Sequence, residues 1–490
     1  MALRISAGTL ANLPNDVAAP KYDRAALSPG ILHVGVGNFH RAHMSVYLDR
    51  LFATGGSHDW AIVGAGIRDS DAVMRDSLAS QDWLTSVVEL DPEGPTASVT
   101  GAMIDFLPID PDAIVAGMAD PRIRIISLTV TEGGYFLDAE GQFDRDRPEI
   151  RADARTLDQP STVFGMILKA LRLRRAAGHP PFTVLSCDNL PGNGAAARRA
   201  VTGLARMTDP ALADWVAEAV AFPNSMVDCI TSATTQRERD LVRERFGIED
   251  SAPVVCEPFR QWVIEDRFSA GRPPLEQVGV EFTGDIARYE LMKLRILNAS
   301  HACIAYAAAL LGYRFIHDAV ADPDILGWLQ VLQKREMIPT LPPLDEVDYH
   351  HYLEAVVTRF SNPGVGDTIA RNAADGSERQ PKFILPALRD ALATGKEMSG
   401  FALEIALWAR YLRGVDEAGG QIVIHDPLAE DLRRRANELD SDPLVFLRNV
   451  RVFGDLAENP RFAERFSHWT RRLDEAGVRE TLQVYAVPSV

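Results

Sequence analysis

The stretch ILHVGVGNFHRAH, residues 31–43, decides the expected fold of the first part of this chain. A short apolar run ends in Gly35 and Gly37, and a segment with helical periodicity follows. Glycines at a strand-to-helix turn allow a tight turn and let the backbone approach a pyrophosphate, which then lies at the helix N-terminus. His40 replaces the third glycine of the GxGxxG pattern, so the motif alone is a weak signal and a buried glycine turn is its alternative.

Similar apolar runs recur along the first half of the chain. They lie within residues 60–66, 122–135, 181–194 and 253–259, and segments with helical periodicity separate them. Strands that alternate with helices indicate an α/β fold with a largely parallel sheet. From about residue 286 helical patterning dominates. The sequence therefore predicts a Rossmann-type dinucleotide-binding domain at 1–285 and a mainly α-helical substrate and catalytic domain at 286–490.

Polar residues follow the predicted strands, where an open parallel sheet binds its ligands. Asp69 and Asp71 come after the second strand, and either could accept the ribose hydroxyls of NAD and so disfavour NADP. Thr131, Glu132 and Asn189 follow later strands, and Asn189 is a candidate oxyanion donor. The alternatives are helix capping for the two aspartates and ordinary turn chemistry for the others.

A second stretch, KLRILNASHACIAYAAALLGY at residues 293–313, predicts a buried helix that carries unexpected polar residues. These are Lys293, Asn298 and His301, with Glu290 one turn earlier. At about 100° per residue, the four fall within less than half of the circumference of a regular helix. They form either a functional cluster or a solvated stripe with a Lys–Glu surface pair.

Proton transfer at an alcohol or carbonyl needs such a cluster. A desolvated lysine loses its charge more readily and can act as a general base near neutral pH. An asparagine amide can donate to a developing oxyanion. A histidine can hold a neighbouring hydroxyl, and a glutamate can pass the proton to water.

Composition limits the class of protein. The 490 residues contain 46% hydrophobic and 24% charged residues, as in ordinary globular proteins, and the net charge of −17 argues against nucleic-acid or anionic-membrane partners. The N-terminus lacks a signal-peptide core, and no apolar run approaches the roughly 20 residues of a membrane helix. We expect a cytoplasmic monomer or small homo-oligomer. The scattered cysteines and histidines predict no metal site.

Six stretches together resemble the polyol-specific long-chain dehydrogenase family, which includes mannitol 2-dehydrogenases, arabinitol dehydrogenases and fructuronate reductases. They are GVGNFHRAH (35–43), SLTVTEGGY (127–135), FTVLSCDNLPGNG (182–194), FPNSMVD (222–228), CEPFRQWVIED (256–266) and MKLRILNASH (292–301). Together with PVVCEPF (253–259) and RFSN (359–362), they make the resemblance nearly full-length, and the K-x4-N-x2-H signature of the family falls on Lys293, Asn298 and His301.

The resemblance implies metal-independent, NAD-dependent oxidation of a secondary carbinol with Lys293 as general base. Asn189 and Asn298 correspond to oxyanion-hole amides, His301 and Arg371 to substrate-binding residues, and Glu290 to a proton relay. For the cofactor, the expected residues are Gly35, Gly37, Phe39, Arg41, Asp71, Thr131 and Glu132.

Some residues depart from the pattern of the mannitol branch. Cys229 stands where many relatives have arginine, and Arg260 and Arg295 resemble the fructuronate reductases. The expected reaction is oxidation of D-mannitol to D-fructose. The alternatives are another polyol such as D-arabinitol or D-sorbitol, a fructuronate/mannonate oxidoreductase, and an NAD-binding sensor without catalysis.

Overall fold

The computed structural model describes residues 2–138, 141–344 and 347–487. The chain forms two compact units, Met1–Ala287 and Arg288–Val490. The division falls within helix α10 (Ile286–Met292), close to the start of the stretch that carries Lys293. Each unit has its own architecture and is described separately.

A parallel sheet with the strand order β7-β4-β3-β8-β9 forms the centre of the first unit. Its strands are β3 (Pro29–Val34), β4 (Ala61–Ala65), β7 (Met103–Phe106), β8 (Ile125–Leu128) and β9 (Thr183–Ser186). Three of them lie within predicted strand segments, β3 overlaps a fourth, and the predicted Rossmann-type fold is confirmed. The sequence analysis missed the edge strand β7, whose sequence MIDF is short and interrupted by Asp105.

The candidate fifth strand at 253–259 belongs to another sheet. Strand β12 (Val254–Cys256) pairs in parallel with β5 (Thr85–Glu89), and the order of this second sheet is β12-β5-β6-β2. Its other members are β6 (Thr96–Thr100) and β2 (Val17–Ala18). Local periodicity identifies a strand but not its partner, because pairing depends on residues far apart in the sequence.

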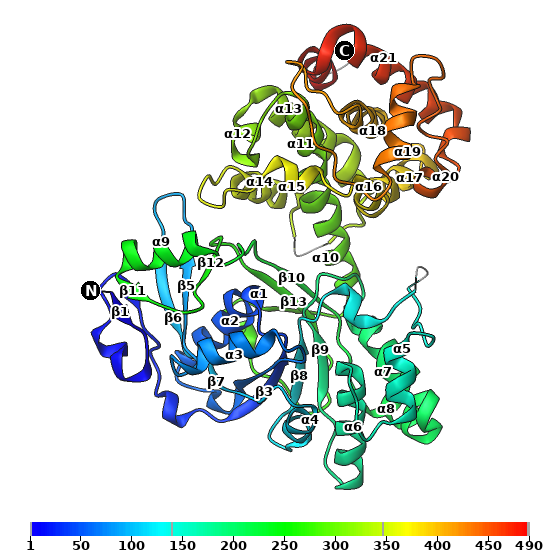
Figure 1. Ribbon diagram of the computed structural model, residues 1–490. Helices are drawn as coiled ribbons and strands as arrows, with labels where there is room; N and C mark the ends of the chain where they lie inside the picture. Colours follow the sequence, from blue (N-terminus) through cyan, green and yellow to red (C-terminus); the bar gives the residue numbers. More distant parts are fainter. Residues whose placement is uncertain (1, 139–140, 345–346, 488–490) are drawn as a thin grey trace. The chain divides into compact units, whose positions relative to one another are not determined.

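Helices cover both faces of the central sheet (Figure 1). Successive side chains of a strand point to opposite faces. Accordingly Ile31 packs in one core with α2 (Met44–Phe52), whereas Leu32 packs in another with α4 (Pro111–Ala119), α6 (Val163–Ala176) and α7 (Asn193–Thr208). With both faces covered, the carboxyl ends of the strands remain available for a ligand.

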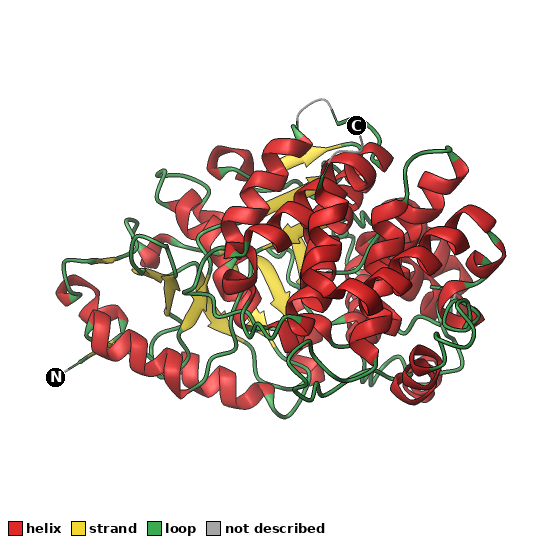
Figure 2. Cartoon of the chain, turned by 90° about the horizontal axis from the view of Figure 1, so that it is seen from above, coloured by secondary structure: helices red, strands yellow, loops and turns green. Residues whose placement is uncertain are grey.

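The second unit is built from helices, drawn red in Figure 2. Helices α11 (Ala299–Leu310) and α18 (Ser399–Leu412) are almost entirely buried, and α21 (Pro460–Ala486) packs along α18. Within the described residues of this unit, β-structure is limited to isolated bridges such as Phe315–Thr368. The predicted mainly helical character is confirmed. No helix in the described part of the chain combines the length and the apolar character of a membrane span.

The regular helix predicted for residues 293–313 is wrong in its first part. Residues Lys293–Asn298 form a π-helical segment, here called the π turn, and α11 follows. The amide of Ala299 donates to the carbonyl of Leu294, five residues earlier. A π-helical turn contains more residues than an α-helical turn, so Asn298 does not lie about 140° from Lys293 as a regular helix requires.

Candidate functional site

The glycine turn after β3 has a backbone that only glycine can adopt easily. Gly35 has φ of +98°, and a Cβ there would lie 2.2 Å from the carbonyl oxygen of Thr129. Gly37 has φ of −93° and caps the short helix α1 (Asn38–Ala42). A Cβ at Gly37 would meet no atom of the protein closer than 3.8 Å. Gly35 is therefore required by the fold, whereas Gly37 leaves space beside the helix N-terminus.

A crevice of about 290 Å³ opens at the carboxyl ends of β3, β4 and β8. Its walls are residues 34–37, residues 129–131 and the segment from Ile67 to Met74 that leads into α3 (Asp71–Ala79). This is the position where doubly wound sheets bind dinucleotides. The predicted cofactor residues Gly35, Gly37, Asp71 and Thr131 all line it.

Asp71 holds the turn before α3 and also lies in the wall of the crevice. Its Oδ2 accepts the amides of Ile67 at 2.9 Å and Arg68 at 3.0 Å, which fixes the turn before α3, and the residue also lines the crevice. Asp69 is not part of the crevice wall. Arg68 and Ser70 line it, and sequence reasoning missed them because the turn offered no motif.

The side chains of Thr129, His33 and His40 form a polar network that supports the glycine turn. Thr129 Oγ1 donates to the carbonyl of Gly35 at 2.6 Å, and His33 Nε2 lies 3.0 Å from the same hydroxyl. The rings of His33 and His40 stack at 3.5 Å. Burial lowers the pKa of His33 to about 3 and holds that of His40 well below its ordinary value, so both rings are neutral. These contacts join residues far apart in the sequence and left no local signal.

The cofactor contacts of Phe39 and Arg41 stay predictions, and the structure shows other contacts for both side chains. Arg41 is buried, and its guanidinium donates to Gly37, Asn38 and the carbonyl of Ala252. Phe39 stacks on His43 at 4.8 Å. Neither residue lines the crevice, because both side chains are used to hold α1 against the rest of the unit.

Asp188 joins the loops that follow β8 and β9. Its carboxylate accepts the amides of Val130 and Thr131 at 3.0 and 2.8 Å and the hydroxyl of Tyr135 at 2.6 Å. Burial raises the pKa of Asp188, and these hydrogen bonds oppose that rise. Thr131 has φ of +68°, an unusual conformation that Asp188 helps to hold. The next residue along the chain, Asn189, is exposed, as is Glu132.

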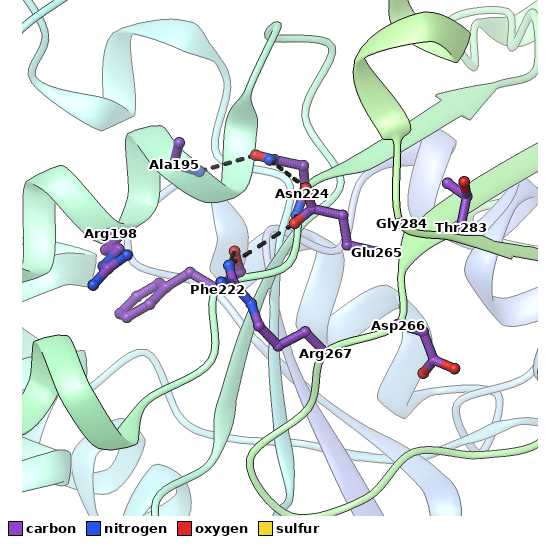
Figure 3. Close-up of a pocket in the computed structure, with 9 residues that line it drawn as sticks. All are labelled: Ala195, Arg198, Phe222, Asn224, Glu265, Asp266, Arg267, Thr283 and Gly284. Atoms are coloured by element: carbon purple, nitrogen blue, oxygen red, sulfur yellow. Dashed lines mark hydrogen bonds and ion pairs between the residues drawn. The ribbon is translucent and has the colours of Figure 1, made fainter.

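The segment that carries Asn189 is fixed at its other end by α7. Asn193 Nδ2 donates to the carbonyls of Asp188 and Ser225, and its Oδ1 accepts the amide of Ser225. Figure 3 shows the adjoining pocket, where Asn224 accepts the amide of Ala195 and donates to Glu265 at 3.0 Å. These bonds hold the start of α7 against β10 (Ser225–Asp228) and β13 (Gln261–Glu265).

In the second unit the π turn displays the predicted polar residues. Lys293 is 8% exposed, and Asn298 is half-buried. Gln333, fully buried in a second π-helical segment (Gln333–Met337), donates to the carbonyl of Arg295 and to Ser300 Oγ, each at 3.0 Å. This side chain satisfies a carbonyl within the distorted backbone, and so it stabilises the π turn.

His301 lies beside a carboxylate that the sequence analysis missed. Its Nε2 is 3.5 Å from Asp367 Oδ2 and makes no hydrogen bond within the described residues, and its ring packs on Phe360 at 4.1 Å. Burial lowers the pKa of His301, which favours the neutral ring. Asp367 also binds Arg371 at 2.9 Å. The four-residue spacing from Asp367 to Arg371 was the available signal.

Burial would raise the pKa of the Asp367 carboxyl, but His301 and Arg371 outweigh that effect and hold it well below its ordinary value. Asp367 is therefore a carboxylate at neutral pH. It orients a neutral imidazole and an arginine that is 62% exposed. Glu290, the predicted relay, is half-buried in α10.

Arg260 and Arg295, the two residues in which the sequence resembles fructuronate reductases, both have partners within the protein. Arg260 pairs with Glu89 at 2.6 Å and donates to the carbonyl of Ala42 at 2.6 Å. Arg295 pairs with Asp390 and donates to Thr340. Both guanidinium groups are therefore already engaged. Among the described residues, no group of three His, Cys, Asp or Glu side chains is arranged to hold a metal ion.

Comparison with known families identifies both units. The model of the mannitol dehydrogenase Rossmann domain matches residues 29–277, and that of the mannitol dehydrogenase C-terminal domain matches residues 285–474. A mannitol 2-dehydrogenase of Cereibacter sphaeroides is 53% identical over 457 residues, which cover 93% of this chain and 96% of that protein. A mannitol 2-dehydrogenase of Phaeosphaeria nodorum is 40% identical over 491 residues, which cover 99% of this chain and 86% of that protein.

Two solved structures are similar over nearly the whole chain. The ternary complex of Pseudomonas fluorescens mannitol 2-dehydrogenase with NAD and D-mannitol is 41% identical, has a TM-score of 0.84 and is matched over 98% of this chain and 99% of that one. A D-sorbitol dehydrogenase in substrate-free form is 37% identical, has a TM-score of 0.92 and is matched over 99% and 100%. Two family models that together span most of the chain, and relatives of this similarity and coverage, lead to one conclusion: the chain belongs to the mannitol dehydrogenase family.

Proposed function

We propose that this protein is an NAD-dependent polyol dehydrogenase that oxidises D-mannitol to D-fructose. One observation carries the proposal: the buried Lys293 lies with Asn298 on the π turn, His301 follows in the first turn of α11, and the chain that carries them is 53% identical to a mannitol 2-dehydrogenase. π-Helical segments are rare and occur frequently at functional sites.

NAD fits the crevice of the first unit. The glycine turn leaves room for a pyrophosphate at the N-terminus of α1, and Asp71 offers a carboxylate to the ribose. Thr131 adds a hydroxyl to the same wall. When bound, NAD supplies the two-electron oxidant for the carbinol.

The residues of the second unit supply acid–base chemistry and substrate recognition. Lys293 in its neutral form takes the proton from the reacting hydroxyl, and Asn298 donates a hydrogen bond to the oxygen as it gains charge. His301 binds a substrate hydroxyl through its imidazole, and Asp367, 3.5 Å from its Nε2, orients both this ring and Arg371. Glu290 passes the proton to water. Asn189, on the first unit, stays a prediction as the second oxyanion donor.

D-Sorbitol is the second candidate substrate, because a D-sorbitol dehydrogenase has a closely similar structure. The uronate reaction is disfavoured because Arg260 and Arg295 are occupied by Glu89 and Asp390, so neither is available to a substrate carboxylate. A sensor without catalysis has no need of a buried base.

A substrate panel tests the proposal. NADH formation is followed with D-mannitol, D-sorbitol and D-arabinitol, and NADH consumption with D-fructose and fructuronate. We expect D-mannitol and D-fructose to give the highest kcat/KM in their directions. A higher value for D-sorbitol or fructuronate would replace the substrate assignment. NADH binding without turnover of any compound would favour the sensor.

In this proposal Asp71 makes the enzyme prefer NAD over NADP, because its carboxylate repels the 2′-phosphate of NADP. The Asp71→Asn variant keeps an oxygen for the amides of Ile67 and Arg68, so the turn before α3 survives. We expect the ratio of kcat/KM for NAD over NADP to fall by about tenfold, as for the loss of one repulsive contact. Asp69→Asn, outside the crevice wall, is the control and should leave the ratio unchanged. If Asp69→Asn changes it instead, the assignment passes to Asp69.

A further inference from the structure

A second concave site of the first unit lies on α7, away from the glycine turn. Arg199, Thr202, Gly203 and Arg206 recur at the spacing of one helix face and line a cavity of about 400 Å³. The opposite wall is the loop that carries Phe143 and Arg145. A Cβ on Gly203 would lie 2.3 Å from the Phe143 ring, so the glycine makes room for the aromatic side chain.

The three arginines of this cavity lack anionic partners. Within the described residues, Arg145, Arg199 and Arg206 make no ion pair and no side-chain hydrogen bond, and Arg199 Nε is buried without a partner. Nearby arginines behave differently: Arg147 lies 3.4 Å from Asp144, and Arg151 lies 2.5 Å from Asp146.

This arrangement is unexpected in a chain with 51 basic and 68 acidic residues and a net charge of −17. Arg145 and Arg206 are exposed and Arg199 is half-buried, so water screens the repulsion between these like charges in part. The buried Nε of Arg199 loses the hydrogen bond that water would give it. A bound anion removes both costs. Arginine is also the side chain that best matches the oxygens of a phosphate, through paired N–H donors.

The pocket of Figure 3 gives the contrasting case. It also contains two arginines, Arg198 and Arg267, but Glu265 and Asp266 line it with them. Arg198 donates to the carbonyl of Ala217 at 2.8 Å, and Arg267 donates to that of Phe222 at 3.2 Å. An anion entering there would meet two carboxylates, whereas acidic residues are absent from the wall of the α7 cavity within the described residues.

We propose that the α7 cavity binds the phosphate group of a small phosphorylated metabolite. The three guanidinium groups and Thr202 contact the phosphate oxygens, and Phe143 and Met207 offer apolar surface to the carbon skeleton. The cavity is large enough for such a molecule, since small-molecule sites span roughly 300–1,000 Å³. This binding is separate from the crevice at Gly35 and does not depend on the proposed substrate.

Calorimetric titration tests the proposal. The full-length protein is first saturated with NADH, which occupies the crevice, and is then titrated at low ionic strength with glucose 6-phosphate and with inorganic phosphate. Glucose is the uncharged control, and sodium chloride of equal ionic strength controls for screening. We expect binding of both phosphate compounds and none of glucose. Stronger binding of glucose 6-phosphate indicates a metabolite, and equal binding indicates that free phosphate alone is recognised, which overturns the metabolite assignment.

Variants locate the site. Arg199→Gln should weaken phosphate binding by at least about tenfold, the effect of losing a charge-assisted hydrogen bond, and Arg199→Gln with Arg206→Gln should abolish it. Arg198→Gln, the neighbouring position on α7, should leave it within twofold. Without ligand, the melting temperature of Arg199→Gln should equal or exceed that of the wild type, because repulsion is relieved. Undiminished binding in the double variant, or no binding to the wild type, overturns the proposal.

Discussion

The glycine turn of the first unit and the π turn of the second unit build their sites in opposite ways. The crevice at Gly35 and Gly37 is shaped by backbone, and side chains such as Thr129 and Asp188 bond to backbone groups around it. At the π turn and the start of α11 the backbone is the support, and the side chains of Lys293, Asn298 and His301 are the proposed reacting groups.

The difference predicts which substitutions each region tolerates. In the crevice, adding one methyl group at a glycine with positive φ should destabilise the fold. Changes of the side chains around the crevice should destabilise it less. In the π turn, removing one functional group abolishes the chemistry and leaves the fold intact. Four predictions test this contrast.

Lys293→Ala has the largest expected effect. Turnover should fall by at least ~10²-fold, because a positioned acid–base group contributes that much. NADH affinity, measured by fluorescence, should stay within about twofold of the wild type, because Lys293 lies outside the crevice and its removal should affect turnover and not cofactor binding. In the wild type, mannitol oxidation should rise with pH and fructose reduction should prefer lower pH, since the two directions need the neutral and protonated amine respectively. Near-normal turnover of the variant would remove the proposed base.

Gly35→Ala should impair the first unit through its backbone. Its new Cβ would lie 2.2 Å from the Thr129 carbonyl at φ of +98°. We expect a loss of about 2 kcal/mol or more in unfolding free energy, from left-handed strain together with the clash. NADH affinity should also fall, by about tenfold or more, since the turn that approaches the pyrophosphate moves.

Gly37→Ala is the matched control for that experiment. The structure leaves space for its Cβ, so its unfolding free energy should be near that of the wild type. NADH affinity should fall nevertheless, because the methyl group occupies the space proposed for the pyrophosphate. Unchanged NADH affinity in Gly37→Ala would show that the cofactor does not approach this backbone.

Gln333→Leu should disturb the π turn without touching a proposed reacting group. It removes the donor to the Arg295 carbonyl and to Ser300 Oγ, at a cost of about 1–3 kcal/mol in stability. We expect kcat to fall by about tenfold as Lys293 shifts, since small displacements of reacting groups are costly. NADH affinity should not change. Gln330→Leu, one turn earlier, is the control, and an equal loss of kcat there would show that the effect is not specific to the π turn.

Glu404→Gln should have the smallest effect on activity and a clear effect on the pH dependence of stability. Burial raises the pKa of Glu404 from 4.5 to about 8, against a hydrogen bond from Gln380 at 2.9 Å. The unfolded chain therefore releases this proton near pH 4.5 while the folded protein keeps it, and the unfolding free energy falls as pH rises toward about 8.

The glutamine cannot ionise but keeps the shape and the acceptor oxygen. In urea unfolding, Glu404→Gln should match the wild type at pH 5 and exceed it by at least about 1 kcal/mol at pH 8, because one pKa unit corresponds to 1.36 kcal/mol. Glu430→Gln, an exposed position on α19 (Ala429–Asn437), should be close to the wild type at both pH values. Parallel pH profiles for wild type and Glu404→Gln would contradict the buried neutral carboxyl.

The sequence by itself determined the main fold and the identity of the principal polar residues. Apolar runs with helical segments between them indicate an α/β fold because the periodicities of strands and helices are local properties, although they do not identify which strands pair. The spacing of Lys293, Asn298 and His301 is also local, and so is the glycine pair at Gly35 and Gly37.

Only the tertiary structure decided how these residues are held. The π turn depends on Gln333, the orientation of His301 on Asp367, and the support of the glycine turn on His33 and Thr129. The contact of Arg41 with Ala252 was not foreseen for the same reason, because the two residues lie more than two hundred positions apart. Each contact joins distant segments, and no local pattern records which distant side chain will satisfy a buried polar group.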